Sequence, residues 1–488
     1  MIISKENFQK NIKIASLVLF VITAFFSVGH LQSDEHFQIL EFAQYKLGKI
    51  SAADLPWEFG EKMRPSLQPW IAYSAIKFFH LLGIENPFVI TFIFRLLSGL
   101  LLWTVITRLN ELIIPKYFKD TKWSNLFYAA TLLLWYIPFT SVRFSSENIS
   151  ALFLLLGFLT LYRKKTNLNF ALIGIFWGLS FLFRYQTGIA VFGAYVFLLF
   201  IERTPISKLI ISIVPLFLIL LFGTYLDTLF YDEFTIAPYN YLKANIFDDK
   251  ASNFGTSPFF AYLYLFLGKA IPPISLLLFL GFISGTIKLK KHIFVWAIIP
   301  FILIHSFVAH KEVRFLFPVN YLFIFISIVG LMKYFETREI KNWQKKLFKF
   351  SIYVNVILLL IMTIKPMNGT VKLFSFAYHN LNSENTYLIS TKRPLYTMLV
   401  NLQTSFYTAE NIRNEVINPE EVENHLTRNN IDECYLLHEK FDFQEKLENY
   451  NLEKVYSEYP EWIKNIEAID WQKKLRTKTI YKVTKKVE

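Results

Sequence analysis

The 488-residue sequence contains a single cysteine, Cys434, so no intrachain disulfide can form and the redox compartment cannot be inferred. It also lacks a glycine-rich loop that could cradle a phosphate, the Cys/His spacing of a zinc site, internal repeats and low-complexity tracts. Charged residues make up only 18% of the chain. These absences argue against a disulfide-stabilised secreted domain, a glycine-loop nucleotide-binding protein and a zinc protein.

Apolar and aromatic residues are abundant instead. Hydrophobic residues make up 53% of the chain and aromatic residues 18%, with 51 phenylalanines. Apolar runs near membrane-crossing length recur between Leu17 and Ile364, which a soluble core does not explain. From Lys365 onward the sequence is polar and charged. The sequence therefore predicts an all-α polytopic membrane domain over residues 1–365 and a small soluble domain over residues 366–488.

Each apolar run approaches the ~20 residues that a helix needs to cross about 30 Å of hydrocarbon. Helices are expected because lipid cannot satisfy exposed backbone groups. The first run is interpreted as an uncleaved span, since no small-residue cleavage site follows it. About 11 spans are predicted, at 12–29, 88–107, 125–141, 146–162, 168–183, 187–201, 207–226, 259–287, 292–309, 314–333 and 348–365.

The distribution of charge predicts the orientation. With a cytoplasmic N-terminus, the inner segments hold 21 Lys/Arg against 6 Asp/Glu, and the outer segments hold 12 against 14. This topology explains the net charge of +13 without nucleic acid as a partner. An odd number of spans places the C-terminal domain outside the cytoplasm. There, β-like runs at Thr386–Ser390, Glu433–His438 and Thr479–Val483 and a helical stretch at Pro419–Asn429 predict a small α/β fold.

Two adjacent acids, Asp34 and Glu35, open the first outer loop. If this segment is helical, Asp34 shares a polar face with Gln38, Glu41 and Tyr45. Repulsion between adjacent acids and desolvation near the membrane are expected to raise their pKa. A carboxylate with a raised pKa suits a general base that takes a proton from a sugar hydroxyl. The alternative is a solvated loop start with an acidic N-cap.

A second polar segment follows in the same loop, which spans residues 30–87. Two prolines bend the backbone around Arg64 and Gln68. Trp57 and Trp70 flank the segment, either as anchors at the membrane interface or as platforms on which a sugar can stack. Both roles for the tryptophans stay open at this point.

Charged residues also gather between two late spans, on the side where topology disfavours cations. They are His310, Lys311, Glu312 and Arg314. Arginine as a fork and lysine as a point charge suit a lipid-linked phosphate, with contact to lipid headgroups as the alternative. Arg143 and Arg184 lie in short loops on the same side and add to a predicted polar site. Arg95, inside the second span, is either a structural ion pair or a functional residue.

These motifs resemble those of the membrane mannosyltransferases of glycosyltransferase family 22, which have the GT-C fold. The Asp-Glu pair at 34–35, the Arg-Pro…Gln-Pro segment at 64–69 and, most specifically, the His-Lys-Glu-x-Arg-Phe block at 310–315 carry the resemblance, which covers about residues 1–335. Members of that family elongate GPI anchors and N-glycan precursors from dolichyl-phosphate-mannose, and the family includes bacterial relatives. The composition, rich in Ile, Asn, Lys and Phe, fits a bacterial member.

The resemblance implies roles for the matching positions. Asp34, with Glu35 beside it, matches the acid taken as the catalytic base, and the block at 310–315 is expected near the donor phosphate. Arg64 and Gln68 would contact substrate. Eukaryotic members usually have Arg-Ser-x-Leu-x-Pro where this chain has Arg-Pro-Ser-Leu-Gln-Pro, so acceptor recognition is expected to differ.

From the sequence we expect an inverting glycosyltransferase that moves mannose or a related hexose from a polyprenyl-phosphate donor to a lipid-linked glycan or another extracytoplasmic acceptor. Lys311 and Arg314 would stabilise the single leaving phosphate, so neither a metal nor another cofactor is expected. The expected location is a bacterial inner membrane, or the endoplasmic reticulum membrane in a eukaryote. The donor, the acceptor and membrane lipids would be its partners.

Other functions stay open. A sister GT-C enzyme would move a sugar onto protein or lipid A. A lipid-linked oligosaccharide flippase or transporter would be expected to have charges along its spans and inverted repeats, whereas this chain concentrates charge on one face. An inactive scaffold is a third possibility.

Overall fold

The computed structural model describes residues 5–381, 385–398, 402–440, 442–445, 447–461 and 477–486. Within these residues the chain forms two compact units. The helical unit contains the described residues up to 27 together with 57–84 and 90–365, and the sheet unit contains 28–56, 85–89 and the described residues from 366 onward. The loop after the first helix is therefore divided between the two units.

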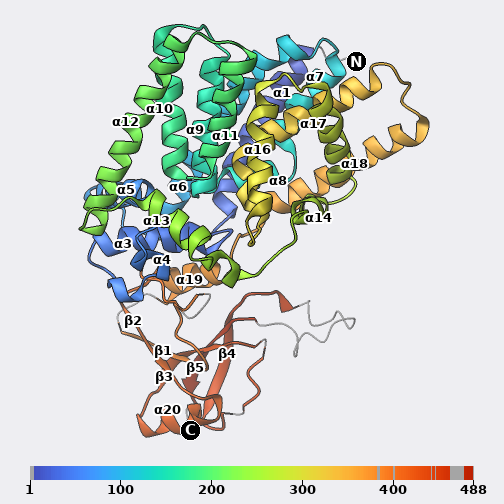
Figure 1. Ribbon diagram of the computed structural model, residues 1–488. Helices are drawn as coiled ribbons and strands as arrows, with labels where there is room; N and C mark the ends of the chain where they lie inside the picture. The colour runs from blue at the N-terminus through green and yellow to red at the C-terminus, as the bar shows by residue number, and fades with distance from the viewer. Residues whose placement is uncertain are drawn as a thin grey trace. The chain divides into compact units, whose positions relative to one another are not determined.

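The helical unit consists mainly of long helices (Figure 1). They are α1 (Lys5–Phe26), α4 (Trp57–Gly60), α5 (Leu67–Leu81), α6 (Pro87–Tyr117), α7 (Thr121–Leu133), α8 (Tyr136–Ser141), α9 (Ser146–Leu161), α10 (Asn167–Phe183), α11 (Thr187–Val196), α12 (Ile206–Tyr231), α13 (Ala237–Leu242), α14 (Ala261–Lys269), α15 (Ile274–Lys288), α16 (Ile293–Phe307), α17 (Asn320–Phe335) and α18 (Asn342–Ile364). Short 3₁₀ or π segments are η3 (Phe197–Ile201), η4 (Lys243–Phe247), η5 (Lys250–Phe254) and η6 (Val313–Val319).

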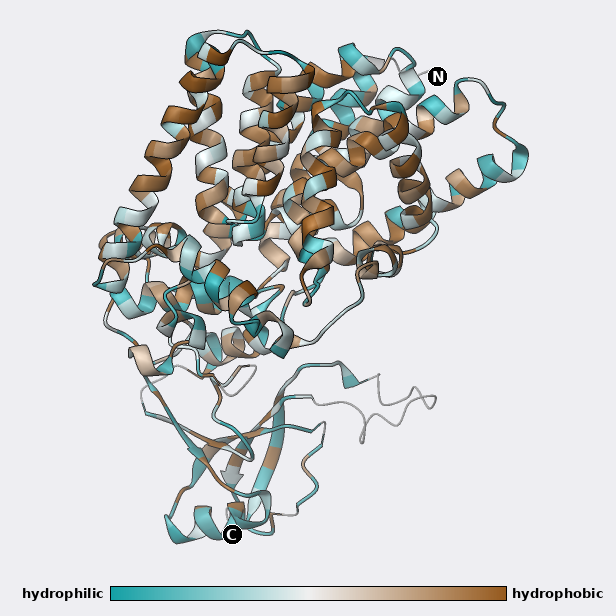
Figure 2. Cartoon of the chain, viewed as in Figure 1, coloured by the Kyte–Doolittle hydropathy of each residue, from teal (hydrophilic) through white to brown (hydrophobic). Residues whose placement is uncertain are grey.

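Length and hydropathy mark many of these helices as membrane spans. Among the described residues, five are long and apolar enough to cross a membrane, at Glu6–Phe26, Pro87–Tyr117, Ile206–Tyr231, Val313–Phe335 and Asn342–Asn380. Five shorter apolar helices accompany them, at Ser146–Leu161, Asn167–Phe183, Thr187–Ile201, Ile274–Lys288 and Ile293–Phe307. Figure 2 shows hydrophobic residues along most of the length of α9 to α12.

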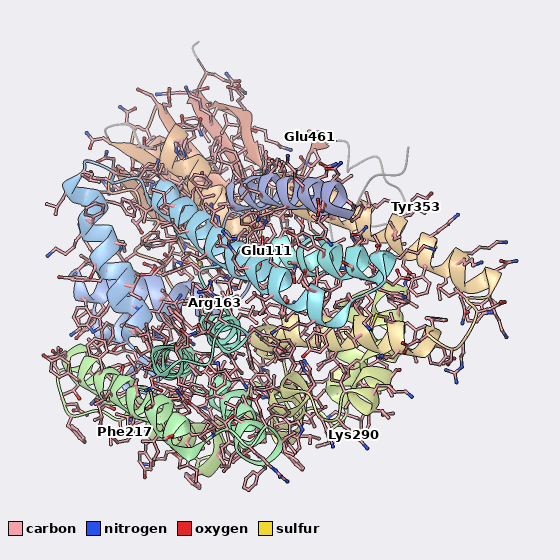
Figure 3. All side chains as sticks on the ribbon, turned by 90° about the horizontal axis from the view of Figure 1, so that it is seen from above. Glu111, Arg163, Phe217, Lys290, Tyr353 and Glu461 are labelled. Carbon is pink, nitrogen blue, oxygen red and sulfur yellow. The ribbon has the colours of Figure 1, made fainter. Side chains whose placement is uncertain are left out.

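The outward surface of the helical unit is also apolar. Phe217 on α12 and Tyr353 on α18, which lie at its edges in Figure 3, are 57% and 67% exposed. Exposed aromatic side chains on long apolar helices are typical of a surface that faces lipid rather than water.

Two of the predicted spans are interrupted. The run 125–141 is split because Leu134 has an extended ψ of 133°, which ends α7 before α8 begins. The run 259–287 breaks at Pro272-Pro273 into α14 and α15, as the missing proline N–H leads one to expect. Helices α6 and α12 instead continue beyond the predicted 88–107 and 207–226.

Glycines allow helices in this unit to pack closely. A Cβ on Gly330 of α17 would lie 1.9 Å from the carbonyl oxygen of Gly281 on α15. A Cβ on Gly174 of α10 would lie 1.8 Å from the carbonyl oxygen of Ser212 on α12. Only glycine fits at these crossings, a pattern common between membrane helices.

The sheet unit begins with a bent helical segment. It comprises α2 (Ser33–His36), the π-helix η1 (Phe37–Glu41), α3 (Phe42–Lys46) and the 3₁₀ turn η2 (Ala52–Asp54). A π-helix adds a residue to the turn, so the single polar face expected for Asp34, Gln38 and Glu41 does not form. Glu41 is fully buried, whereas Asp34 and Gln38 are partly exposed. The predicted polar stripe was wrong at Glu41.

The rest of this unit is α19 (Gly369–Asn380) and a mixed sheet with the strand order β2-β1-β3-β5-β4 (Figure 1). Strands β1 (Thr386–Ser390), β2 (Ile412–Val416) and β3 (Glu433–His438) are parallel, and β5 (Thr479–Lys485) runs antiparallel to β3 and to β4 (Tyr450–Ser457). The turn η8 (Pro419–Glu421) and α20 (Val422–Arg428) match the predicted helical stretch. The α/β prediction is confirmed, although β2 and β4 were missed.

Candidate active site

The turn between α8 and α9 positions a buried acid, Glu147. Ser145 caps α9 by accepting a hydrogen bond from the backbone N–H of Asn148 at 3.4 Å. The Asn148 side chain donates to the carbonyl oxygen of Arg143 at 2.9 Å, which tightens the turn. Glu147 therefore lies in the first turn of α9, where the helix dipole favours a carboxylate, and it is only 4% exposed.

Two arginines from distant parts of the sequence meet at Glu147. Arg184, which follows α10, donates to Oε1 of Glu147 at 2.9 Å, and Arg314 of η6 donates to the same oxygen at 3.4 Å. Arg314 also forms a bidentate pair with Glu312, at 2.7 and 3.1 Å. Nε2 of His310 lies 3.0 Å from Oε1 of Glu312. The structure thus brings Arg184, His310, Glu312 and Arg314 into one cluster.

An aromatic ring completes this cluster. The guanidinium groups of Arg184 and Arg314 lie 5.1 and 5.3 Å from the ring centroid of Phe315. Their side chains are only 7% and 10% exposed, so the cation–π contacts are shielded from water. Carboxylates and the ring together hold both guanidinium planes in fixed orientations.

Lys311 lies in the same loop but has a different environment. Its ammonium donates to the carbonyl oxygens of Ser257, at 2.9 Å, and Val308, at 2.6 Å. The side chain is 7% exposed, and burial lowers its pKa. Two of its three N–H donors therefore fix the loop that precedes η6.

Arg143 and Gln68 make separate hydrogen bonds at the turn that precedes α9. Arg143, which is 1% exposed, donates to the carbonyl and hydroxyl oxygens of Ser27, each at 2.7 Å. Gln68 donates to the carbonyl oxygen of Phe144 at 3.1 Å. These contacts place Gln68 against the turn that carries Glu147.

Arg64 lies in a different polar environment within the helical unit. It pairs with Glu58 at 3.3 Å, and its guanidinium lies 5.8 Å from the ring centroid of Tyr241. The hydroxyl of Tyr231 donates to the Arg64 carbonyl oxygen at 2.9 Å. The proline-rich segment is thereby fixed to the end of α12.

Sequence reasoning missed Asp227, which is 3% exposed near the end of α12. Its Oδ1 accepts hydrogen bonds from the backbone N–H of Ser66 at 2.8 Å and from the Ser66 hydroxyl at 2.6 Å. Its position at the end of a long apolar run could have revealed it, because ionisable residues in membrane spans are rare unless they have a partner or a function.

The two acids of the first outer loop belong to the sheet unit. Oε2 of Glu35 accepts a hydrogen bond from the backbone N–H of Leu31 at 2.8 Å. Asp34 precedes it in α2 and is partly exposed. Glu35 therefore holds the chain that enters α2, whereas the cluster around Glu147 is part of the helical unit.

Glu41 is the centre of a buried network that sequence reasoning did not find. It lies 2.8 Å from Nε2 of His36 and accepts hydrogen bonds from the Thr404 hydroxyl, from the Ser405 hydroxyl at 2.6 Å and backbone at 3.1 Å, and from the Phe406 backbone at 3.2 Å. Burial alone would raise the pKa of Glu41, but His36, Ser405 and Thr404 bring it below its ordinary value of 4.5. The carboxylate thus joins η1 to residues 404–406.

We expect Glu41→Gln to lower the free energy of unfolding by about 1–3 kcal/mol, because the amide cannot accept all of these buried donors. Since folding lowers the pKa of Glu41, its stabilisation is present above about pH 4.5 and is lost as the pH falls through the folded pKa. The difference between variant and wild type should therefore shrink in acid. Denaturant unfolding of the protein in detergent measures both effects. Glu410→Gln, at an 84% exposed side chain paired with Lys49, is the control and should change little.

Among the described residues, no group of three or more His, Cys, Asp or Glu side chains is arranged to hold a metal ion. The cations and acids above form ion pairs and hydrogen bonds instead.

Comparison with known proteins identifies the class. The fold is similar to that of ArnT from Cupriavidus metallidurans, solved bound to undecaprenyl phosphate, with a TM-score of 0.55, 11% identity and 97% of each chain covered. This likeness supports a GT-C fold. The model of the Alg9-like mannosyltransferase family matches residues 12–400.

Curated relatives agree with that match. The chain is 24% identical over 385 residues to GPI alpha-1,2-mannosyltransferase 3 of Bos taurus, covering 75% of this chain and 68% of that protein. It is 26% identical over 359 residues to GPI mannosyltransferase 3 of Candida albicans, covering 73% and 68%. The chain belongs to the Alg9-like mannosyltransferase family. It is a glycosyltransferase and a multi-pass integral membrane protein, so the family and enzyme class predicted from the sequence are confirmed. Of the predicted fold, the mostly helical GT-C architecture and the C-terminal sheet are confirmed.

Proposed function

We propose that this protein transfers mannose from a polyprenyl-phosphate-linked donor to a hydroxyl of a glycan acceptor, with inversion at the anomeric carbon. The observation that carries the proposal is the pair of buried guanidinium groups of Arg184 and Arg314, held around Phe315 by Glu147 and Glu312. The donor class is supported by the family and by the lipid phosphate bound to the structurally similar ArnT.

The cluster suits a leaving phosphate for electrostatic reasons. Two carboxylates balance the two arginines, and Lys311 adds a positive charge on the same loop. Because the guanidinium planes are already fixed, stabilising the phosphate charge requires little reorganisation. Arg314 would be the main ligand, with His310 and Glu312 orienting it. Gln68 and Arg64 would line the acceptor side of the same unit, and Arg143 would support the turn that carries Glu147.

Asp34 is proposed as the general base that takes the proton from the acceptor hydroxyl. The proton moves to the carboxylate as the oxygen attacks the anomeric carbon and the phosphate leaves with the electron pair of the broken bond. Asp34 is preferred to Glu35 because Asp34 is the position that matches the catalytic acid in the family resemblance.

The proposal is tested by incubating the purified protein with polyprenyl-phosphate-mannose and a lipid-linked glycan and by weighing the product. A gain of one hexose, with inverted configuration by NMR, is expected. Cells without the protein should lack the corresponding glycan mass. Purified, folded protein that transfers no hexose from any polyprenyl-phosphate sugar would contradict the proposal.

We also propose an orientation of the protein in the membrane and a boundary between its two domains. About 11 spans with a cytoplasmic N-terminus would place the active site and the domain at 366–488 outside the cytoplasm, because cationic loops stay inside. We expect a reporter fused after Glu488 to be active only on the extracytoplasmic side. A matched fusion in the cationic loop at Arg163-Lys164-Lys165 should report the cytoplasm. Cytoplasmic activity at both positions would overturn this topology.

A further inference from the structure

The sheet unit has a cavity of about 200 Å³ at the carboxyl ends of its parallel strands. Thr391 and Lys392 follow β1, Pro419 follows β2, and Glu439 and Lys440 follow β3. The remaining lining residues are His438, Phe443, Gln444 and Glu445. Every parallel strand of the sheet thus contributes to one hollow.

The topology of the sheet explains why the hollow forms there. Strands β1 and β3 are neighbours, with Ser390 opposite Leu437. The chain leaves β1 toward β2 on one side and leaves β3 toward β4 and β5 on the other. Adjacent parallel strands whose connections diverge leave a crevice at their carboxyl ends, which is the usual ligand site of open α/β sheets.

A buried polar pair lies at the base of this crevice. The hydroxyl of Thr391 lies 2.9 Å from Nδ1 of His438, and each residue is 8% exposed. The His438 ring packs edge-on against Phe443, with centroids 5.1 Å apart at 89°. Phe443 is held in turn by the Tyr481 hydroxyl, which accepts a hydrogen bond from its backbone N–H at 3.1 Å. The base is therefore a fixed combination of hydroxyl, imidazole and aromatic ring.

The walls carry charges of both signs. Lys392 lies 3.6 Å from Glu439. The cavity walls also contain Lys440, Glu445 and the amide of Gln444. This balance does not favour an anion or a cation, whereas a sugar offers hydroxyls that donate to carboxylates and accept from ammonium and amide groups. Its apolar ring face can pack on an aromatic side chain. The volume is below the range of about 300 Å³ and above for drug-sized ligands, and suits a single ring.

We propose that the C-terminal sheet binds one neutral hexose unit of a glycan in this cavity, at a site separate from the residues assigned to sugar transfer. The proposed transfer needs only the donor and an acceptor hydroxyl, so this site goes beyond it. Glu439 and Gln444 hydrogen-bond the sugar hydroxyls, and Phe443 packs against the ring.

The site is tested on the full-length protein in detergent by saturation-transfer NMR, titrating methyl α-D-mannopyranoside as the probe. Saturable binding in the millimolar range is expected for wild type. Glu439→Gln should weaken it about five-fold or more, because a charge-assisted hydrogen bond to the sugar becomes a neutral one. Glu433→Gln is the matched control, since Glu433 begins the same strand and also pairs with a lysine, Lys482, at 2.9 Å. It should bind like wild type.

Further variants separate this site from the transfer site and from folding defects. Gln444→Ala removes an exposed side chain and should also weaken binding, which covers the case that Glu439→Gln fails to fold. Arg314→Ala should keep the signal. Absence of saturable binding in wild type, wild-type binding in both cavity variants, or loss of the signal in Arg314→Ala would each overturn the proposal. Displacement of the probe by inorganic phosphate at equal concentration would overturn the neutral-sugar assignment.

Discussion

Replacing Asp34 by asparagine should lower the turnover of mannose transfer by about 10²–10⁴-fold, the usual contribution of general-base assistance. The side chain keeps its size but can no longer take a proton. Donor binding should therefore stay close to wild type, and the loss should appear in kcat. Single-turnover transfer with purified protein, together with donor titration, measures both quantities.

Two neighbouring variants sharpen this test. Glu35→Gln should cost less, because Glu35 accepts a hydrogen bond from the Leu31 backbone and a glutamine oxygen can replace that acceptor. Asp54→Asn, at an acid of the same loop that pairs with Ser51 at 2.7 Å, should leave transfer unchanged. If Glu35→Gln is the more damaging variant, the base is Glu35. If folded protein with both acids neutralised loses little activity, the general-base mechanism is wrong.

Arg314→Ala should lower the efficiency of transfer about ten- to hundredfold, by removing charge-assisted hydrogen bonds worth roughly 1.5–3 kcal/mol to the donor phosphate. Arg314→Lys should recover only part of this loss, since an ammonium cannot form the bidentate pair with Glu312. Arginine and lysine are not interchangeable at Lys311 either. Lys311→Arg should have less than wild-type activity, because the larger guanidinium must replace an ammonium bound to two carbonyl oxygens.

The control for Arg314 is Arg338→Ala. Arg338 also lies over an aromatic ring, 4.2 Å from the centroid of Tyr334, but it is exposed and outside the cluster. Thermal unfolding of each variant separates lost binding from lost folding. Wild-type efficiency in folded Arg314→Ala protein would remove Arg314 from the donor site.

The sequence was sufficient to locate the long apolar helices, because such runs have few alternatives in a membrane, but not the breaks within 125–141 or the ends of α6 and α12. It was also sufficient for β1 and β3, whose residues are mostly buried and apolar. Strands β2 and β4 lie at the two edges of the sheet and carry polar residues such as Arg413 and Glu453. An edge strand can carry polar residues on both faces, so it lacks the apolar pattern from which strands are predicted.

The candidate site could be predicted in part for a similar reason. The block at 310–315 is contiguous, so its residues could be assigned to the candidate site from the sequence. The convergence of Arg184 and Arg314 on Glu147 depends on how α9, α10 and η6 pack, which no local pattern encodes. The π-helix at 37–41 likewise ends at Glu41, whose hydrogen-bond partner Ser405 is far away in the sequence, and no local pattern indicated either feature.

The Glu41 network has a consequence for the order in which the protein is made. Glu41 leaves the ribosome early, but its partner Ser405 lies 364 residues later. At a synthesis rate of about 5–20 residues per second, the hydrogen-bond partners of the Glu41 carboxylate are made roughly 20–70 s after Glu41 itself. The segment that carries Asp34 thus acquires its final support only after the membrane helices have been synthesised. A nascent or truncated chain that ends before residue 404 therefore lacks the contacts that complete the segment bearing the proposed base.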